Sequence, residues 1–344
     1  MLDVSRPTED ARAWFRILGR YGEPETSRSI LELVMTAGAF ALLWTLTWLA
    51  LDVGYWASLL LAVPTAGFLV RLFMIQHDCG HGAFFRRRAA NDWVGRMIGV
   101  LTLTPYDFWR RGHAVHHANV GNLDHRGVGE ITTLTTEEYR ALTPLHRLLY
   151  RLHRNPIVLF GLLPPYLFVL HYRFPAGFMK AGPRPWLSTM GTNAAIAGVV
   201  ALTAALVGLG PFFLVQGPVV LIATSIAVWF FYVQHQFEDM RWEHDGRWSF
   251  HEAALHGSSY YELPTVLAWF TGYIGVHHVH HLCSRIPFYR LPQVLRDHPQ
   301  LSRISRLTLF QSLRCATLAL WDESQGRLIS FRELRGHRLA RAVQ

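Results

Sequence analysis

Three short runs of the sequence are rich in histidine: His77-Asp-Cys-Gly-His81, His113-Ala-Val-His116-His117 and His277-His278-Val-His280-His281. On a helix, residues at i, i+3 and i+4 share one face, so each run would present its imidazoles together. With 19 histidines in 344 residues, one HxxHH pattern is expected about 0.06 times by chance, and this chain has two. The spacing therefore predicts metal binding by eight imidazoles: His77, His81, His113, His116, His117, His277, His280 and His281.

The number of imidazoles limits which metal centre is expected. Imidazole binds zinc, copper, iron and nickel, and a single structural zinc would take only four ligands. Eight imidazoles instead suit two metals, each with three to five nitrogen ligands and an open position. A di-iron centre that binds O₂ fits this count, while the residues alone leave two zinc or two copper ions open.

The composition predicts an integral membrane protein with a substantial polar part. Hydrophobic residues make up 51% of the chain and charged residues only 17%, against about 25% in ordinary soluble domains. The net charge of +9 could indicate nucleic-acid binding. However, the basic residues flank apolar stretches and do not form a soluble basic face interleaved with stacking aromatics. We therefore expect a membrane environment and no nucleic-acid partner.

Four stretches are apolar enough to cross a bilayer, for which a helix needs about 20 residues. The two tight turns that join them in pairs contain no Lys or Arg, whereas the other segments hold nearly all of these residues. The positive-inside rule then places both termini and the histidine runs on the cytosolic side of the inner membrane. Two shorter apolar stretches, 93–103 and 156–170, suit interfacial or re-entrant pieces, and a fifth span is left open. The predicted spans are about 30–52, 55–76, 190–209 and 212–233.

The expected architecture is an all-α integral membrane protein forming a single domain over 1–344. Two transmembrane hairpins would carry a helical cap, formed by residues 77–189 and 235–300, that holds a di-metal site. Outside the spans, apolar residues recur at three- and four-residue spacing, and no alternating strand pattern is convincing. Residues 301–344 are rich in Arg and Leu, which predicts an amphipathic helix pair at the membrane surface.

The series HxxxH, HxxHH, HxxHH, interleaved with two hydrophobic hairpins, resembles the integral-membrane fatty-acid desaturase family over about residues 30–300. Longer runs are similar to bacterial and cyanobacterial acyl-lipid desaturases, the Δ5 and Δ12 types in particular. The runs are Phe231-Tyr-Val-Gln-His235-Gln-Phe-Glu-Asp239, Gly257-Ser-Ser-Tyr-Tyr-Glu-Leu-Pro264 and Ile274-Gly-Val-His-His-Val-His-His-Leu282.

The resemblance implies a ninth ligand, His235, just past the fourth span. Its position supports this independently, because His235 follows the fourth span as His77 follows the second. The family pattern also favours His277 over His278, although His278 and His281 share a face at i, i+3. Tyr273 and Phe288 depart from the pattern, since many relatives carry Asn at both places, and these changes put regioselectivity in doubt more than the metal site.

Ligand imidazoles usually donate their second N–H to a carboxylate or carbonyl. We favour Asp124 and Glu238 as such partners, with Asp78, Asp239, Asp107 and Glu262 as further candidates. The isolated histidines are expected to be ordinary surface or structural residues. They are His125, His146, His153, His171, His244, His251, His256, His298 and His337.

Removing hydrogen from an unactivated methylene needs a stronger oxidant than any amino-acid side chain, so a metal centre must supply it. The resemblance implies two Fe²⁺ ions, O₂ as co-substrate, an acyl lipid as substrate and a cis double bond as product. It also implies a separate electron donor, a ferredoxin or flavodoxin. Because these donors are acidic, the arginines at 86–88 and 110–111 could dock one, or could equally contact lipid phosphates.

Two alternatives remain at this point. A hydroxylase or carotenoid ketolase of the same superfamily would use the same metals. A membrane haem protein or metal transporter that uses histidine pairs is more remote, because the spans hold almost no ionisable residues.

Overall fold

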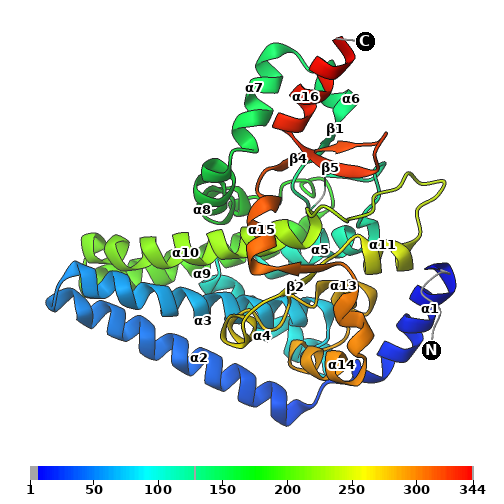
Figure 1. The fold of residues 1–344 in the computed structure, drawn as a ribbon. Coiled ribbons are helices and arrows are strands. Elements are labelled where there is room, and N and C mark those ends of the chain that lie inside the picture. Colours follow the sequence, from blue (N-terminus) through cyan, green and yellow to red (C-terminus); the bar gives the residue numbers. More distant parts are fainter. Residues whose placement is uncertain (1–6, 128, 343–344) are drawn as a thin grey trace.

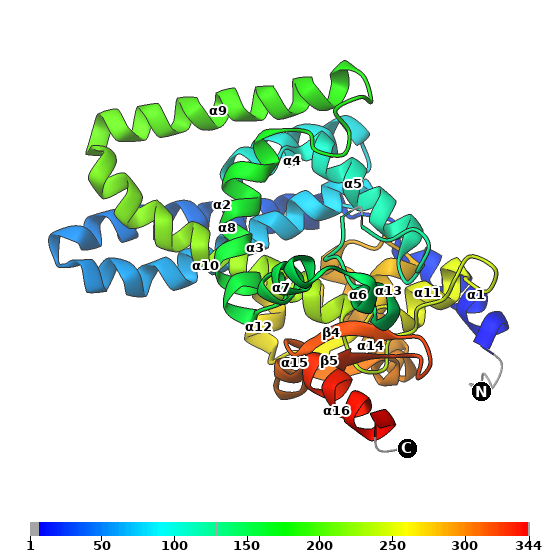
Figure 2. The same cartoon turned by 90° about the horizontal axis from the view of Figure 1, so that it is seen from above.

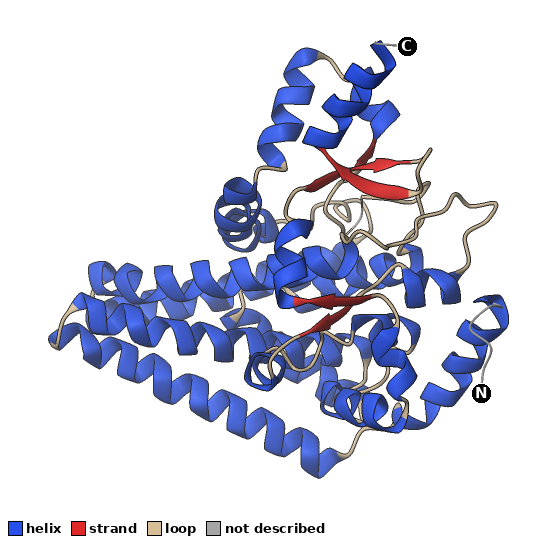
Figure 3. Cartoon of the chain, in the orientation of Figure 1, coloured by secondary structure: helices blue, strands red, loops and turns tan. Residues whose placement is uncertain are grey.

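The computed structural model describes residues 7–127 and 129–342, with side chains described between 11 and 336. The described chain is mainly helical and carries two small sheets (Figure 3). The helices are α1 (Pro7–Leu18), α2 (Thr26–Leu49), α3 (Tyr55–His81), α4 (Arg88–Leu101), α5 (Tyr106–Asn119), α6 (Thr136–Ala141), α7 (Pro144–His153), α8 (Leu163–Pro165), α9 (Pro183–Val207), α10 (Leu209–His235), α11 (Phe250–His256), α12 (Thr265–Phe270), α13 (His277–Leu282), α14 (Leu291–Asp297), α15 (Leu309–Cys315) and α16 (Phe331–Ala342). The strands are β1 (Leu134–Thr135), β2 (Tyr260–Glu262), β3 (Arg306–Thr308), β4 (Leu318–Asp322) and β5 (Arg327–Ser330).

Four helices, α2, α3, α9 and α10, are long and apolar enough to cross a membrane, as the sequence predicts. They form two hairpins whose turns lie at one end of the bundle, and both ends of the described chain lie toward the other (Figure 1). Gly54 and Gly208 make the turns at φ values of +147° and +85°, which side chains with a Cβ rarely adopt. The hairpins therefore carry the histidine-rich segments at one common end.

Two of the spanning helices continue beyond the predicted apolar stretches, and this extension carries histidines. The second stretch was expected to end near 76, but α3 runs on to His81 and ends at Gly82, which has a φ of +66°. Likewise α10 continues to His235. Hydropathy indicates where an apolar stretch ends, whereas a helix ends only where the backbone leaves helical φ and ψ angles. Both helices therefore carry histidines beyond their apolar stretches.

The shorter apolar stretch at 156–170 belongs to a bent helical pair. Residues Pro144–His153 and Val158–Arg173 meet at an angle of 59°, which suits either a broken span or a re-entrant piece. Pro164 and Pro165 lie in the second member of the pair, where proline removes backbone donors and favours such irregularity.

The predicted helical architecture is confirmed, but the cap also contains two small sheets, and residues 301–344 hold strands as well as two helices, which the sequence did not predict. Strand β4 lies between β1, to which it is parallel, and β5, to which it is antiparallel, while β3 pairs in parallel with β2. In the described part of this segment, up to residue 342, the helices are α15 and α16, beside a short 3₁₀ turn that ends at Arg303. Every residue of β4 is buried, so its apolar run lacks the two-residue alternation by which a strand is recognised.

Candidate metal centre

The nine predicted histidines gather into two neighbouring groups. Within each group, one ring nitrogen from every histidine lies within 4.8 Å of the others. The groups adjoin, because the rings of His117 and His281 stack with centroids 4.0 Å apart. The five-histidine group comprises His77, His81, His113, His117 and His280, and the four-histidine group comprises His116, His235, His277 and His281.

Two of the three histidine runs contribute to both groups. From α5, His113 and His117 join the five-histidine group, while His116 joins the other. From α13, His280 joins the five-histidine group, while His277 and His281 join the other. One turn of each helix therefore supplies both groups, which fixes the groups relative to one another.

The contacts within the groups are ones that imidazoles alone cannot satisfy. The Nε2 atom of His277 lies 2.9 Å from that of His235 and 3.1 Å from that of His281. A neutral imidazole nitrogen either donates one proton or accepts one, so a chain of such contacts cannot be fully paired. Burial lowers the pKa of His277 and His281, which keeps these rings neutral and able to bind a cation. The donor set therefore fits metal ions.

The same reasoning applies to the five-histidine group. The Nε2 atom of His113 lies 3.0 Å from that of His81 and 3.1 Å from that of His117, which in turn lies 3.2 Å from that of His280. Burial lowers the pKa of His113, His117 and His280 as well. Both groups thus offer converging neutral nitrogens, the form in which histidine ligates metals.

A tight backbone arrangement fixes the segment before α13. The Tyr261 N–H donates to the Gly275 carbonyl at 2.7 Å, and a Cβ on Gly275 would lie 2.3 Å from the Tyr261 carbonyl oxygen. Tyr273 has a φ of +53°, in the left-handed region that favours Gly and Asn. Asn tolerates this conformation better than Tyr does, so Tyr273 is a locally strained residue.

The C-terminal end of α10 is anchored by the buried Arg154, which is 4% exposed. Its guanidinium donates to the Gln236 side chain at 3.2 Å and to the Leu318 carbonyl at 2.7 Å. Because Gln236 follows His235 directly and Leu318 begins β4, the sheet that sequence reasoning missed helps to position His235. Arginine is suited to this position because its five donors can bind several acceptors at once.

Two carboxylates contact the outer nitrogens of the histidines. The Nδ1 atom of His77 lies 3.3 Å from Asp78, whose other oxygen accepts the Phe288 N–H at 2.7 Å. The Nδ1 atom of His116 lies 3.3 Å from Glu130, and burial raises the pKa of Glu130 to about 8. Sequence reasoning named Asp78 but missed Glu130, which lies in a loop 13 residues after the second run with no motif to mark it.

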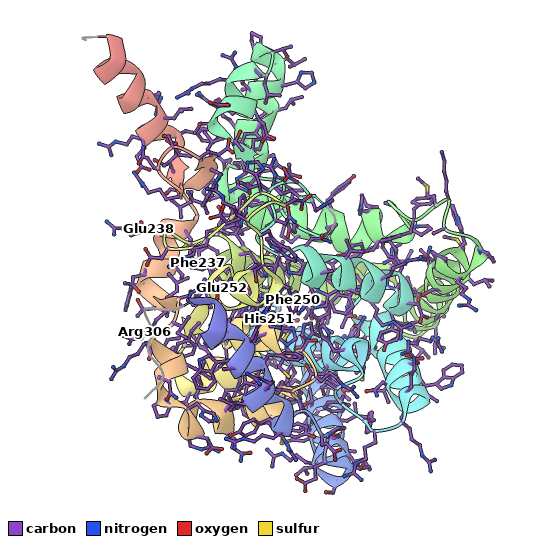
Figure 4. The ribbon with its side chains drawn as sticks, turned by 90° about the vertical axis from the view of Figure 1, so that its right-hand side faces the viewer. Phe237, Glu238, Phe250, His251, Glu252 and Arg306 are labelled. Atoms are coloured by element: carbon purple, nitrogen blue, oxygen red, sulfur yellow. The ribbon has the colours of Figure 1, made fainter. Side chains whose placement is uncertain are left out.

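The two carboxylates favoured from the sequence lie elsewhere. Asp124 accepts from His244 at 2.8 Å and from the Asp245 N–H at 2.9 Å, away from the histidine groups. Glu238 and Asp239 are exposed, and Glu238 lies at the edge of the molecule in Figure 4. The chain leaves the helical path after α10, so proximity to His235 in sequence does not bring these two side chains toward it. Among the further candidates, Asp107 pairs with Arg96 and Glu262 with Arg306.

The histidines outside the nine make other contacts. His278 is buried and its Nε2 atom lies 3.0 Å from the Leu301 carbonyl, apart from both groups. Among the isolated histidines, His244 pairs with Asp124 and Glu323, and His298 contacts Arg20 and Tyr21. His337 lies outside the part of the chain whose side chains the structure describes.

Removing the Glu130 carboxylate is expected to loosen the four-histidine group. In Glu130→Ala, His116 loses the acceptor for its Nδ1–H, and metal affinity should fall about 10- to 100-fold. The measurement is the chelator concentration that strips half of the metal from the purified protein. Asp124→Ala is the matched control and should leave this concentration unchanged; equal behaviour of the two variants would contradict the role of Glu130.

Comparison with known proteins decides the family. The family model described as fatty acid desaturase matches residues 54–312, which include all nine histidines. The chain belongs to the fatty acid desaturase family. It is 44% identical to a fatty acid desaturase of Bacillus subtilis over 315 residues, covering 92% of this chain and 89% of that protein.

Cyanobacterial relatives of this desaturase are more distant. An sn-1 acyl-lipid omega-3 desaturase (ferredoxin) of Synechocystis is 29% identical over 64% of this chain and 61% of that protein. An sn-1 oleoyl-lipid 12-desaturase of the same organism is 26% identical over 78% of this chain and 75% of that protein. The protein is thus an oxidoreductase with membrane-spanning helices and a histidine-rich site suited to metal. The remote haem-protein and transporter alternatives are set aside.

Proposed function

We propose that this desaturase introduces a cis double bond into a lipid-linked acyl chain, using two iron ions held by its nine histidines. The observation that carries the proposal is the convergence of the histidines into two adjoining groups at one end of the spanning helices. His77, His81, His113, His117 and His280 would hold one ion, and His116, His235, His277 and His281 the other. With one histidine fewer, the four-histidine group would leave its ion more able to take a further ligand.

Two bound ferrous ions would supply the O₂ chemistry that protein side chains lack. The overall reaction consumes one O₂, two electrons from a donor and two protons. A saturated –CH₂–CH₂– unit becomes –CH=CH–, and two waters are released. The printed names of the acyl-lipid relatives support a lipid-linked substrate.

The chain's own residues hold the centre and shield it from water. Asp78 and Glu130 accept from the outer nitrogens of His77 and His116, which fixes the orientation of these rings. The Trp109 ring stacks on His113 at a centroid distance of 4.6 Å, and the Phe231 ring lies 5.1 Å from that of His116. Such apolar cover limits the access of water to the oxidising centre.

We further propose that the centre faces the cytosol at the inner membrane and receives electrons from a separate ferredoxin or flavodoxin. The orientation rests on the distribution of Lys and Arg, which avoid both hairpin turns. The donor class is supported by the ferredoxin named for the Synechocystis and Arabidopsis relatives.

The test is to express the protein in a host without polyunsaturated fatty acids and to profile total lipids by gas chromatography–mass spectrometry. A His116→Ala variant is the control, and iron per chain is measured in parallel. We expect a new double bond that is absent from the control. A hydroxylated or keto product would replace the desaturase proposal with its nearest alternative, and an unchanged lipid profile without bound iron would refute the oxygenase proposal.

A further inference from the structure

A groove of about 1090 Å³ lies between α4, α5 and the first half of α9, outside the histidine groups. Figure 2 shows α9 running apart from α2 and α3, and its apolar stretch is only 6% buried. The lining residues extend along α9 from Arg184 to Ala195, about 16 Å at 1.5 Å per residue. The predicted span begins near residue 190, so the groove extends from the segment before the span into its first turns.

The outer part of the groove is strongly basic. Five arginines line it, and three of them pair with two aspartates: Arg96 pairs with Asp107 at 2.9 Å, and Arg110 and Arg88 both pair with Asp92. Among the described residues, no carboxylate pairs with the remaining two, Arg111 and Arg184, which are both exposed. Five guanidinium groups against two carboxylates favour an anionic ligand, and Arg is well suited to bind phosphate.

Apolar side chains line the rest of the groove. Trp93 and Met97 on α4 are 64% and 61% exposed, and Leu187 on α9 is 71% exposed. Ser188, Gly191 and Ala195 are small, which keeps the α9 wall open. A tryptophan between arginines and an apolar wall is typical of the membrane interface. The ligand that matches both parts has an anionic head and apolar chains.

The groove lies beside two of the helices that carry the histidines. Gly80 on α3 and Ala114 on α5 belong to its lining, but none of the nine histidines does. Successive residues on a helix point in different directions, so His81 and His113 face away from the groove wall that their neighbours form. The groove is therefore a site separate from the metal centre.

We propose that this groove binds a phospholipid of the surrounding leaflet, with its phosphate held by Arg111 and Arg184 and an acyl chain along Trp93, Met97 and Leu187. The inference goes beyond the proposed function, because it assigns a phospholipid site that lies outside the histidine groups. A water-soluble electron donor fits less well, because it cannot follow the groove along a spanning helix. Arg86, in contrast, lies outside the groove and pairs with Glu23.

The test measures lipid binding directly, without turnover. Wild type and the double variant Arg111→Gln/Arg184→Gln are purified as full chains in detergent, and dioleoylphosphatidylglycerol and dioleoylglycerol are titrated with detection by native mass spectrometry. We expect about tenfold weaker binding of phosphatidylglycerol to the double variant. Binding of dioleoylglycerol, which lacks phosphate, should be weak and equal in both proteins. The matched control, Arg332→Gln/Arg335→Gln on α16, removes two exposed arginines away from the groove and should bind as wild type does.

Three results would overturn the proposal. The first is unchanged phosphatidylglycerol binding by the double variant, and the second is displacement of the lipid by an equal concentration of inorganic phosphate. The third is loss of binding to a reduced ferredoxin, with lipid binding intact, because the groove would then belong to the donor. Iron content and lipid profile are measured on the same proteins: wild type that binds phospholipid but forms no double bond refutes the proposed function and not the groove.

Discussion

Replacing His277 with alanine is expected to remove the metal from the four-histidine group and to abolish product formation. The Nε2 atom of His277 contacts those of both His235 and His281, so its loss opens the middle of that group. A group reduced to three imidazoles loses a ligand that the remaining side chains cannot replace, and both metals are needed together in the proposed reaction. Iron content should fall from two per chain toward one, and the new double bond should disappear from the lipid profile.

The neighbouring residue provides the control. His278 is equally buried, but its Nε2 atom lies 3.0 Å from the Leu301 carbonyl, outside both groups. His278→Ala removes one hydrogen bond, worth about 1 kcal/mol, and leaves a small cavity. It should keep two irons per chain and form product. If His278→Ala instead loses iron while His277→Ala retains it, the ligand assignment in this segment is wrong.

Replacing Glu32 with leucine is expected to destabilise the whole bundle by about 3–5 kcal/mol. Glu32 on α2 and Arg71 on α3 form an ion pair at 2.5 Å, and both side chains are almost fully buried. Without the carboxylate, the Arg71 guanidinium stays buried with its charge uncompensated, and it cannot reach water from this position. The measurement is equilibrium unfolding of the detergent-solubilised protein.

The effect should extend to the metal centre, because Arg71 also connects the third histidine run to α3. Its guanidinium donates to the Trp269 carbonyl and lies 3.9 Å from the centre of the Trp269 ring, in the helix that precedes α13. Loss of the pair should therefore weaken metal retention as well as stability. Arg28→Gln is the matched control: Arg28 pairs with the same carboxylate at 2.7 Å, but its side chain is 49% exposed. This control should cost less than about 1 kcal/mol, and equal effects of the two variants would contradict the buried-pair argument.

The sequence predicted the parts of the molecule that depend on local patterns. The four spanning helices follow from runs of apolar residues, because every backbone polar group in a bilayer must be paired within a helix. The strands of the cap were missed for a related reason. β4 is buried along its whole length and β1 is only two residues long, so neither shows an alternating pattern, and their pairing joins residues nearly 190 apart.

The carboxylates that contact the histidines were also predicted only where a local pattern marked them. Asp78 was found because it stands within the first run, whereas Asp124 and Glu238 were chosen by nearness along the chain. Glu130 reaches His116 only because the loop after α5 turns back over that helix, as the 3.1 Å approach expected between a Cβ on Gly129 and the Gly112 carbonyl also indicates. A loop of this kind carries no periodicity from which its path could be inferred.

The sequence by itself determined that eight imidazoles at helical spacing would lie at one end of two hydrophobic hairpins as a donor set suited to metal, because residue type and spacing are local properties. Only the tertiary structure decided how the runs divide, with His116 apart from His113 and His117, and His280 apart from His277 and His281. It also decided that Glu130 supports His116 and that five arginines and an apolar wall enclose one groove. Those arrangements depend on contacts between segments distant in the chain, and such contacts are fixed by packing and by the need to pair buried polar groups.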